Sequence, residues 1–311
     1  MSRIHEALKR AEQERTAGQG GQGEASVSNA AVTTEGFQPA APVVEHAPAS
    51  VQAAMPSLGT PFTFDTLLAR CAQANWTPDL KTMLFFNAEE QGFGTEEFRT
   101  LRSRLYQMRE RQPLKKILVT SSLPKEGKSF VAANLAQVMV RQHGRRALLI
   151  DGDLRGARLH TALGTTATPG LAEYLMGEAD EFQIIQRGPM ENLFFIPSGR
   201  EISNPAELVA NGRLKFLLNR VEALFDWIVI DSPPAVPVSD PSLLANYCDG
   251  VLMVVRSNAT PFDIARKARM EFRETHLVGV VLNGIDVNSA TYNRYYYGAY
   301  GKPDGRGVPQ R

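Results

Sequence analysis

Short runs of consecutive apolar residues recur along most of the chain, and amphipathic stretches separate them. The apolar runs cover residues 117–120, 147–150, 193–196, 227–230, 251–255 and 278–282. Stretches with helical spacing lie between them, notably at 130–140, 205–224 and 261–275. Strands buried on both faces have this continuous apolar character, and helical connections make neighbouring strands parallel. The pattern predicts an α/β fold, a mainly parallel sheet with helices on both faces, whose ligands bind at the carboxyl ends of the strands.

The first 60 residues lack this pattern. Residues 1–15 carry apolar positions at helical spacing and predict a short amphipathic helix. A helix this short is marginal in water, so it either frays or docks on a partner. Residues 16–60 are rich in Gly, Ala, Pro, Ser and Gln, and no Lys or Arg occurs between Arg15 and Arg70. Such a segment buries too little apolar surface to offset its chain entropy, and we predict a disordered linker.

Three further segments follow. Residues 61–94 are expected to pack against the main domain, although their pattern defines no regular structure. Their large apolar side chains include Trp76, Leu84, Phe85 and Phe86. Residues 95–290 are predicted to form the main domain, beginning with a helix at 95–111, and residues 291–311 are predicted to be a tail.

Composition narrows the function classes. The 311 residues carry a net charge of +1, which gives no electrostatic reason to expect nucleic acid as a partner. The two cysteines, Cys71 and Cys248, are far apart and fit neither a disulfide framework nor an iron–sulfur site. No apolar run approaches the roughly 18 residues that a membrane-spanning helix needs. We therefore expect a cytoplasmic protein with no direct membrane span.

A glycine-containing loop follows the first apolar run and precedes a helical stretch. It reads Ser122-Leu-Pro-Lys-Glu-Gly127-Lys128-Ser129. A P-loop needs a tight turn, inward backbone N–H groups and a helix N-terminus, with a lysine for the terminal phosphates and a hydroxyl for Mg²⁺. The alternative is a Gly-Lys-Ser loop without a ligand. The residues predicted to contact the nucleotide here are Ser122, Lys125, Glu126, Gly127, Lys128, Ser129 and Phe130.

Acidic residues end two later apolar runs. Asp151 and Asp153 follow one run, and Asp231 follows another. Carboxylates gathered at one place are costly unless a cation compensates them, and Mg²⁺ beside a nucleotide is such a cation. The alternative for Asp151 and Asp153 is a surface acidic turn paired with Arg155 and Arg158.

Two other polar positions remain open. Asp240 is expected to be a helix cap or a loop residue. Asn283, at the end of the last apolar run, either contacts a purine base or forms an Asn-Gly turn.

The tail holds five of the chain's eight tyrosines within nine residues, in polar surroundings without a hydrophobic period. These are Tyr292, Tyr295, Tyr296, Tyr297 and Tyr300. Near a nucleotide site they are candidate phosphoryl acceptors. A sticky aromatic segment is one alternative, and a stacking surface for nucleic acid is another that the low net charge disfavours.

With these motifs, the chain from about 95 to 300 resembles the bacterial tyrosine kinases of capsule and exopolysaccharide synthesis, a branch of the MinD/ParA-like P-loop ATPases. The most specific match is three apolar residues followed by Asp-x-Asp-x-Arg, at 148–155. The run at 228–234, ending Asp-Ser-Pro-Pro, is similar to the family's Walker B motif. The extreme N-terminus resembles the leader helix of single-chain members. Glu96, Arg99 and Arg102 match the family's Glu-x-x-Arg-x-x-Arg helix, which implies a ring-like homo-oligomer.

The resemblance implies a mechanism with ATP and Mg²⁺. Lys128 would bridge the β- and γ-phosphates, Ser129 would bind Mg²⁺ and Asp231 would hold it through water. Asp151 and Asp153 would act in catalysis, and Asp151 would also assist with the metal. The acceptors would be tail tyrosines of a neighbouring protomer, and their phosphorylation would signal ring disassembly.

The resemblance also implies a partner, a separate membrane-embedded activator related to polysaccharide chain-length determinants, which would recruit the protein to the inner face of the membrane. Two positions depart from common patterns. Lys125 stands where many members have Gly, and Leu123 stands where MinD and ParA proteins carry a signature lysine. The competing hypotheses are a MinD/ParA-like ATPase switch without tyrosine phosphorylation and a regulator that binds nucleotide without turnover.

Overall fold

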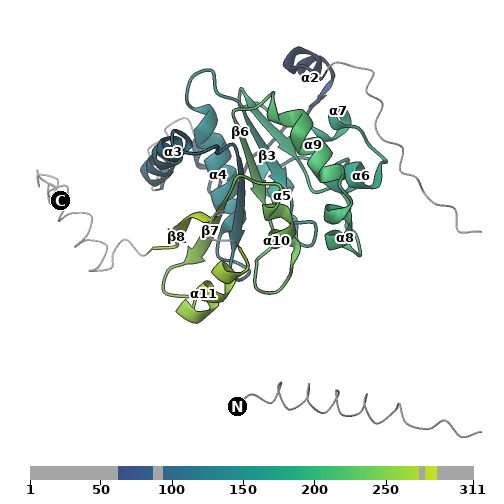
Figure 1. The fold of residues 1–311 in the computed structure, drawn as a ribbon. Coiled ribbons are helices and arrows are strands. Elements are labelled where there is room, and N and C mark those ends of the chain that lie inside the picture. Colours follow the sequence, from purple (N-terminus) through teal and green to yellow (C-terminus); the bar gives the residue numbers. More distant parts are fainter. Residues whose placement is uncertain (1–61, 87–93, 273–276, 286–311) are drawn as a thin grey trace, which may run out of the picture. The chain divides into compact units, whose positions relative to one another are not determined.

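The computed structural model describes residues 62–86, 94–272 and 277–285. The predicted N-terminal helix (1–15), linker (16–60) and tyrosine-rich tail (291–311) lie outside these residues. In the described part, eight strands form one sheet in the order β1-β4-β5-β3-β6-β2-β7-β8 (Figure 1). The strands are β1 (Ala72–Gln73), β2 (Lys116–Ser121), β3 (Ala147–Asp151), β4 (Gln186–Arg187), β5 (Leu193–Ile196), β6 (Trp227–Asp231), β7 (Gly250–Arg256) and β8 (Leu277–Asn283). Every neighbouring pair is parallel except β4 and β5. The predicted α/β fold is confirmed.

Helices connect the strands. They are α2 (Phe64–Arg70), η1 (Leu84–Phe86), α3 (Thr95–Arg109), α4 (Lys128–Val140), α5 (Leu159–Leu163), α6 (Leu171–Met176), α7 (Glu181–Ile184), α8 (Pro205–Ala210), α9 (Arg213–Glu222), α10 (Asp240–Ala245) and α11 (Phe262–Met270). The single helix expected at 205–224 was wrong, because Gly212 has a left-handed backbone with φ +83° and separates α8 from α9.

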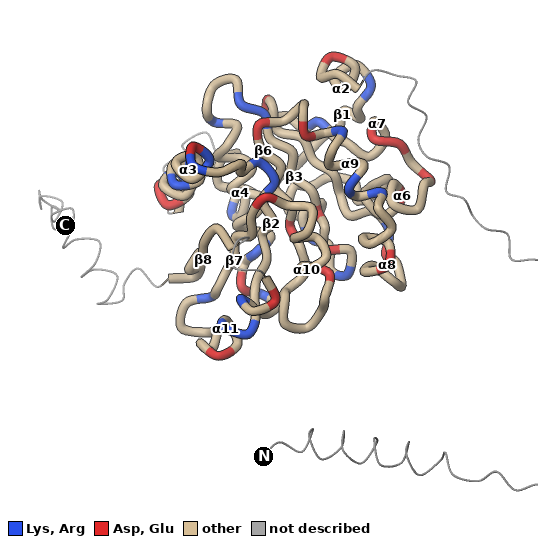
Figure 2. Tube along the Cα trace, in the orientation of Figure 1, with Lys and Arg blue, Asp and Glu red and all other residues tan. Residues whose placement is uncertain are grey.

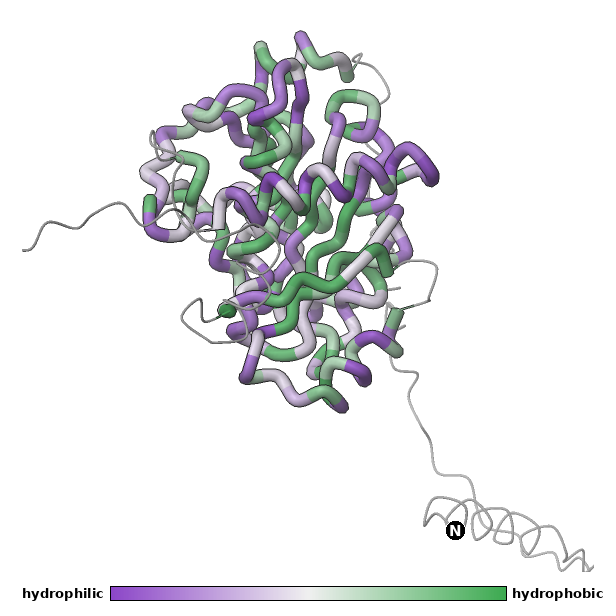
Figure 3. Tube along the Cα trace, turned by 90° about the vertical axis from the view of Figure 1, so that its left-hand side faces the viewer, coloured by the Kyte–Doolittle hydropathy of each residue, from purple (hydrophilic) through white to green (hydrophobic). Residues whose placement is uncertain are grey.

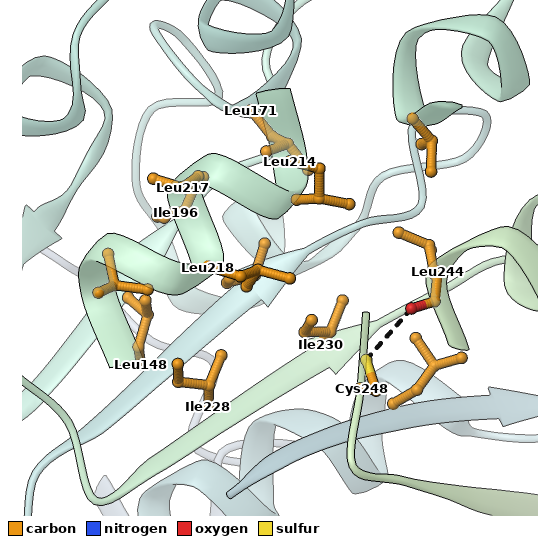
Figure 4. Packing of buried hydrophobic residues seen from close by; sticks show 14 of the residues in the cluster. Leu148, Leu171, Ile196, Leu214, Leu217, Leu218, Ile228, Ile230, Leu244 and Cys248 are labelled. Atoms are coloured by element: carbon orange, nitrogen blue, oxygen red, sulfur yellow. Dashed lines mark hydrogen bonds between the residues drawn. The ribbon is translucent and has the colours of Figure 1, made fainter. Parts of the chain in front are cut away.

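The sheet is covered on both faces, and alternate residues of one strand serve different cores. In β3, Leu148 and Ile150 join the core under α6, α9 and α10, whereas Ala147 and Leu149 join the core under α3 and α4. The first core holds leucines of α9 against isoleucines of β5 and β6 (Figure 4). In Figure 3 the central strands form a continuous hydrophobic band inside more polar helices.

The segment before α3 packs on the second core. Trp76 and Phe85 are buried, with exposed fractions of 6% and 0%. Two buried amide side chains of α4 hold η1, because Asn134 Oδ1 accepts from the Leu84 N–H at 2.8 Å and Gln137 Oε1 accepts from the Phe85 N–H at 3.2 Å. Buried polar groups in the middle of a core helix thus satisfy the backbone of a neighbouring segment.

Helix α3 lies outside α4 and carries basic and acidic residues along its length (Figure 2). Within the ranges described, no helix combines the length and the apolar character needed to cross a bilayer.

Candidate functional site

The sheet topology brings the predicted polar residues together at the carboxyl ends of its central strands. Strands β2, β6 and β3 are neighbours, and Asp231 at the end of β6 is in register with both Val119 of β2 and Asp151 of β3. The glycine-containing loop leaves β2 at the same edge, because the strands are parallel. Residues more than 100 positions apart in sequence therefore share one site.

The loop after β2 has the backbone of an anion-binding turn. Lys125 and Gly127 both adopt left-handed conformations, with φ +66° and +96°, and α4 begins at Lys128. A left-handed residue next to right-handed ones points successive N–H groups into one concavity. The lysine that replaces Gly at 125 thus takes the conformation that normally favours Gly. Ser122 is buried, and its Oγ has no hydrogen-bond partner among the described residues.

Lys128 lies between the loop and the acidic residues. Its Nζ is 2.8 Å from Asp153 Oδ2, 3.3 Å from Ser129 Oγ and 3.9 Å from Asp231 Oδ2. Burial alone would lower the pKa of Lys128, but the charges of Asp231 and Asp153 outweigh burial and raise it. The lysine is therefore a cation that neutralises part of a buried acidic cluster.

Asp151 is fully buried and held by its own loop. Its Oδ1 accepts from the Asp153 N–H at 3.3 Å, and its Oδ2 accepts from the Leu159 N–H at 3.2 Å. Burial, with the nearby charges of Asp231 and Asp153, raises the pKa of Asp151 to about 8. A carboxyl group with a pKa near neutrality can exchange a proton at physiological pH.

Asp153 is held differently. Its Oδ1 accepts from the N–H groups of Arg155 and Gly156 at 3.3 and 3.0 Å, and its Oδ2 faces Lys128. The alternative of a surface acidic turn was wrong, since Asp153 is only 5% exposed and Arg155 pairs elsewhere.

Asp231 is the least satisfied of the three carboxylates. It is 1% exposed, and neither of its carboxylate oxygens has a hydrogen-bond partner in the described part of the chain. Burial raises its pKa to about 6, although the charge of Lys128 opposes the increase. The Lys128 ammonium group is 3.9 Å from Asp231 Oδ2, and carboxylate oxygens this deeply buried, close to the Ser129 hydroxyl, fit a bound cation as well.

Within the described ranges, no group of three or more His, Cys, Asp or Glu side chains is arranged to hold a metal alone. Mg²⁺ is commonly held by one or two carboxylates together with substrate phosphates. The donor set around Asp231 and Ser129 therefore fits a metal that arrives with a nucleotide.

Three other predicted contact residues face the protein. The Glu126 side chain is 3% exposed, and its Oε2 accepts from the Leu123 N–H at 2.7 Å. The Phe130 ring packs edge-on against Phe98, with centroids 5.8 Å apart. Asn283 donates from Nδ2 to the Glu126 carbonyl at 2.9 Å. The Glu126 side chain is thus directed into the protein, and the Asn283 amide is bound to the loop.

Sequence patterns did not single out the ion pair between Arg155 and Asp240. The Arg155 guanidinium donates to both carboxylate oxygens of Asp240, at 2.6 and 3.1 Å. Asp240 is the first residue of α10 and 2% exposed, and the N-cap position before it is Ser239. The sequence predicted a cap or loop residue and did not predict this contact. The ion pair joins the loop after β3 to the start of α10. No local signal links positions 85 residues apart.

The residues predicted for oligomerisation lie on α3. Glu96 and Arg99 form an ion pair. Arg102 is only partly exposed, and its Nη1 donates to the Val138 carbonyl at the end of α4 at 3.0 Å. Arg102 therefore also stabilises the fold of its own chain.

Known proteins are similar to this chain in sequence and in fold. Residues 115–262 match the family model described as an AAA domain. The chain is 34% identical over 218 residues to the tyrosine-protein kinase YwqD of Bacillus subtilis, covering 70% of this chain and 90% of that protein. The chimerical protein CapA2B2 superimposes with a TM-score of 0.61 at 26% identity, over 70% of this chain and 96% of that one. The kinase domain of the Escherichia coli tyrosine kinase ETK superimposes with a TM-score of 0.56 at 28% identity, over 62% and 77% of the two chains. This chain belongs to the family of bacterial tyrosine-protein kinases.

Proposed function

We propose that this chain is an ATP-dependent protein-tyrosine autokinase that phosphorylates the tyrosine cluster of its own tail. The observation that carries the proposal is the convergence of Lys128, Asp151, Asp153 and Asp231 at the carboxyl edge of the sheet, beside a loop shaped for phosphates. The acceptors are Tyr292, Tyr295, Tyr296, Tyr297 and Tyr300.

ATP binds with its phosphates in the loop from Ser122 to Ser129, in the concavity of backbone N–H groups and at the N-terminus of α4. Lys128 contacts the β- and γ-phosphates, for which it exchanges its contact with Asp153. Ser129 and Asp231 hold Mg²⁺, with Asp151 beside them. Bound Mg²⁺ supplies neutralisation of charge on the phosphate oxygens.

In the transfer step, the tyrosine oxygen attacks the γ-phosphorus and the bond to the β–γ bridging oxygen breaks, leaving ADP. The hydroxyl proton passes to the Asp151–Asp153 pair. Burial raises the pKa of Asp151, which makes its ionised form a stronger base than a carboxylate in water. Phosphoryl transfer relies on positioning and electrostatics, and this small set of residues supplies both.

The proposed setting is exopolysaccharide or capsule synthesis in the cytoplasm, at the inner face of the membrane through a separate membrane-embedded activator. Protomers phosphorylate one another in a ring assembled through Glu96, Arg99 and Arg102. Each phosphate adds about −1.5 to −2 charges to the tail, so an acidic site repels a modified tail and the ring comes apart.

The test is phosphotyrosine mass spectrometry on the wild type and on Lys128→Met, each expressed separately. Phosphate on residues 292–300 is expected in the wild type and lost in the variant. Lys215→Met, an exposed lysine on α9, is the matched control and is expected to keep the phosphate.

Changing the five tail tyrosines to Phe separates the kinase from an ATPase switch. A kinase loses nearly all of its phosphotyrosine. A switch has none to lose and keeps nucleotide-dependent assembly, and that result, together with an unmodified wild-type tail, would contradict the proposal.

A further inference from the structure

The phosphate-binding loop is fastened from outside by residues at the carboxyl ends of β7 and β8. Glu126 lies between the two left-handed residues of the loop, and its side chain points into the protein. Its Oε1 accepts from the hydroxyl of Thr260 and, at 3.4 Å, from the Arg256 N–H. Its Oε2 accepts from the Leu123 N–H within the loop itself. One buried carboxylate therefore joins both ends of the turn to the loop that follows β7.

Two further bonds fasten the backbone of the same turn. Asn283 donates to the Glu126 carbonyl at 2.9 Å, and the Arg256 Nη1 donates to the Lys125 carbonyl at 3.1 Å. A Cβ atom at Gly127 would lie 2.0 Å from Asn283 Nδ2, so the amide is pressed against the loop. The Thr260 hydroxyl in turn accepts from the Arg256 N–H at 3.3 Å, which fixes its direction toward Glu126.

The turn needs such support. Lys125 holds a left-handed backbone, which residues with a side chain rarely adopt. A strained conformation persists only where surrounding contacts hold it in place. Of the contacts to Glu126 and to the two carbonyls, only the one from Leu123 uses an N–H group of the loop.

We infer that Glu126, Thr260 and Asn283 form a latch that presets the phosphate-binding conformation of the loop. They are positioning residues, because they act on the ligand through the backbone of the loop. The inference rests on the proposed binding of nucleotide in this loop and adds determinants from two strand ends outside the P-loop and the acidic motifs.

Nucleotide affinity of the full-length protein tests the latch. Thr260→Val removes the hydroxyl and keeps the shape, and we expect ATP and ADP to bind about tenfold more weakly, as for the loss of a hydrogen bond to a buried charge. Thr260→Ser restores the hydroxyl and is expected to bind within about twofold of wild type. Thr165→Val removes a comparable hydroxyl bond, to Gln186 at the opposite edge of the sheet, and is expected to leave affinity unchanged.

A kinetic comparison separates the latch from the reacting groups. KM for ATP should rise by the same factor as the dissociation constant in Thr260→Val, with kcat within about threefold of wild type. Wild-type affinity in Thr260→Val would overturn the latch, and so would equal losses in the Ser and Val variants, because the hydroxyl would then not matter.

Hydrogen exchange gives a second readout that needs neither phosphotransfer nor a variant at Thr260. The amide of Leu123, which donates to Glu126 Oε2, is expected to exchange at least about fivefold faster in Asn283→Ala without nucleotide, because one bond that holds the Glu126 backbone is gone. Unchanged exchange would overturn the latch. Both measurements remain informative if no tyrosine is phosphorylated, so failure of the kinase proposal and failure of the latch are distinguishable.

Discussion

The ammonium group of Lys128 lies 2.8 Å from Asp153 Oδ2, so the loop lysine and the acidic motif after β3 form one charged unit. Both side chains are largely buried, at 12% and 7% exposure. A phosphate that reaches Lys128 competes with Asp153 for the same cation. We therefore predict that Asp153 weakens nucleotide binding, although the proposed function gives it a part in the reaction.

Asp153→Asn should therefore separate binding from transfer. The amide cannot compete for Lys128 as a carboxylate does, so ATP is expected to bind at least as tightly as to the wild type. Tail phosphorylation is expected to fall by about 100-fold or more, the usual effect of losing a group that handles a proton. Titration of ATP binding beside quantitative phosphotyrosine analysis checks both halves. A variant with weaker ATP binding would contradict the competition.

Asp151→Asn should stabilise the protein while it removes activity. The folded pKa of Asp151, about 8, lies above its ordinary value of 3.8, so the folded state holds this proton more tightly than the unfolded chain. Stability from the protonated group is complete below about pH 4 and is lost as the pH rises through 8. At pH 8 without nucleotide or Mg²⁺, the neutral amide is expected to raise the melting temperature by about 2–4 °C. This shift corresponds to an increase of roughly 1 kcal/mol in the free energy of unfolding.

Thermal melts of wild type and Asp151→Asn from pH 5 to 9 make this comparison. The gain should grow with pH and shrink toward pH 5, where the wild-type carboxyl keeps its proton. A gain independent of pH would show that the charge of Asp151 is not its cause.

Asp240→Ala should destabilise the fold by about 1–3 kcal/mol. Asp240 is buried, and the change leaves Arg155 without its bidentate partner. The loss of stability is smaller than for a fully buried ion pair because the Arg155 side chain is 41% exposed. Urea denaturation measures the loss. Glu178→Ala breaks the ion pair of Glu178 with Arg200, whose side chains are about half exposed, and is expected to cost no more than about 1 kcal/mol.

Phe85→Ala should be among the more damaging single changes, with a loss of about 3–5 kcal/mol. The Phe85 ring is completely buried and packs edge-on against Phe98 at 6.3 Å. Phe262→Ala, at an aromatic that is 83% exposed on α11, is the matched control, with an expected change within about 0.5 kcal/mol. If Phe85→Ala lost as little stability as Phe262→Ala, the segment before α3 would contribute little to the core.

The local pattern of apolar and polar residues was sufficient to predict most of the strands and the main motifs of the site. Six apolar runs predicted strands that the structure contains, with ends within about two residues, because strands buried on both faces must be apolar throughout. The phosphate loop and the carboxylates at strand ends were also visible, since each is a short continuous motif. The predicted helix at 205–224 failed at Gly212, where one left-handed residue interrupts an otherwise helical pattern.

The fold class, the loop between the first strand and its helix, and the acidic groups after two later strands all follow from the amino-acid pattern. The partners of those groups follow only from the folded structure. It turned the Glu126 side chain inward to Thr260, paired Arg155 with Asp240, and left the oxygens of Asp231 without hydrogen-bond partners in the described part of the chain. The order of the strands brings together residues 85 to 157 positions apart, and neither hydrophobic period nor local motif specifies which of them meet.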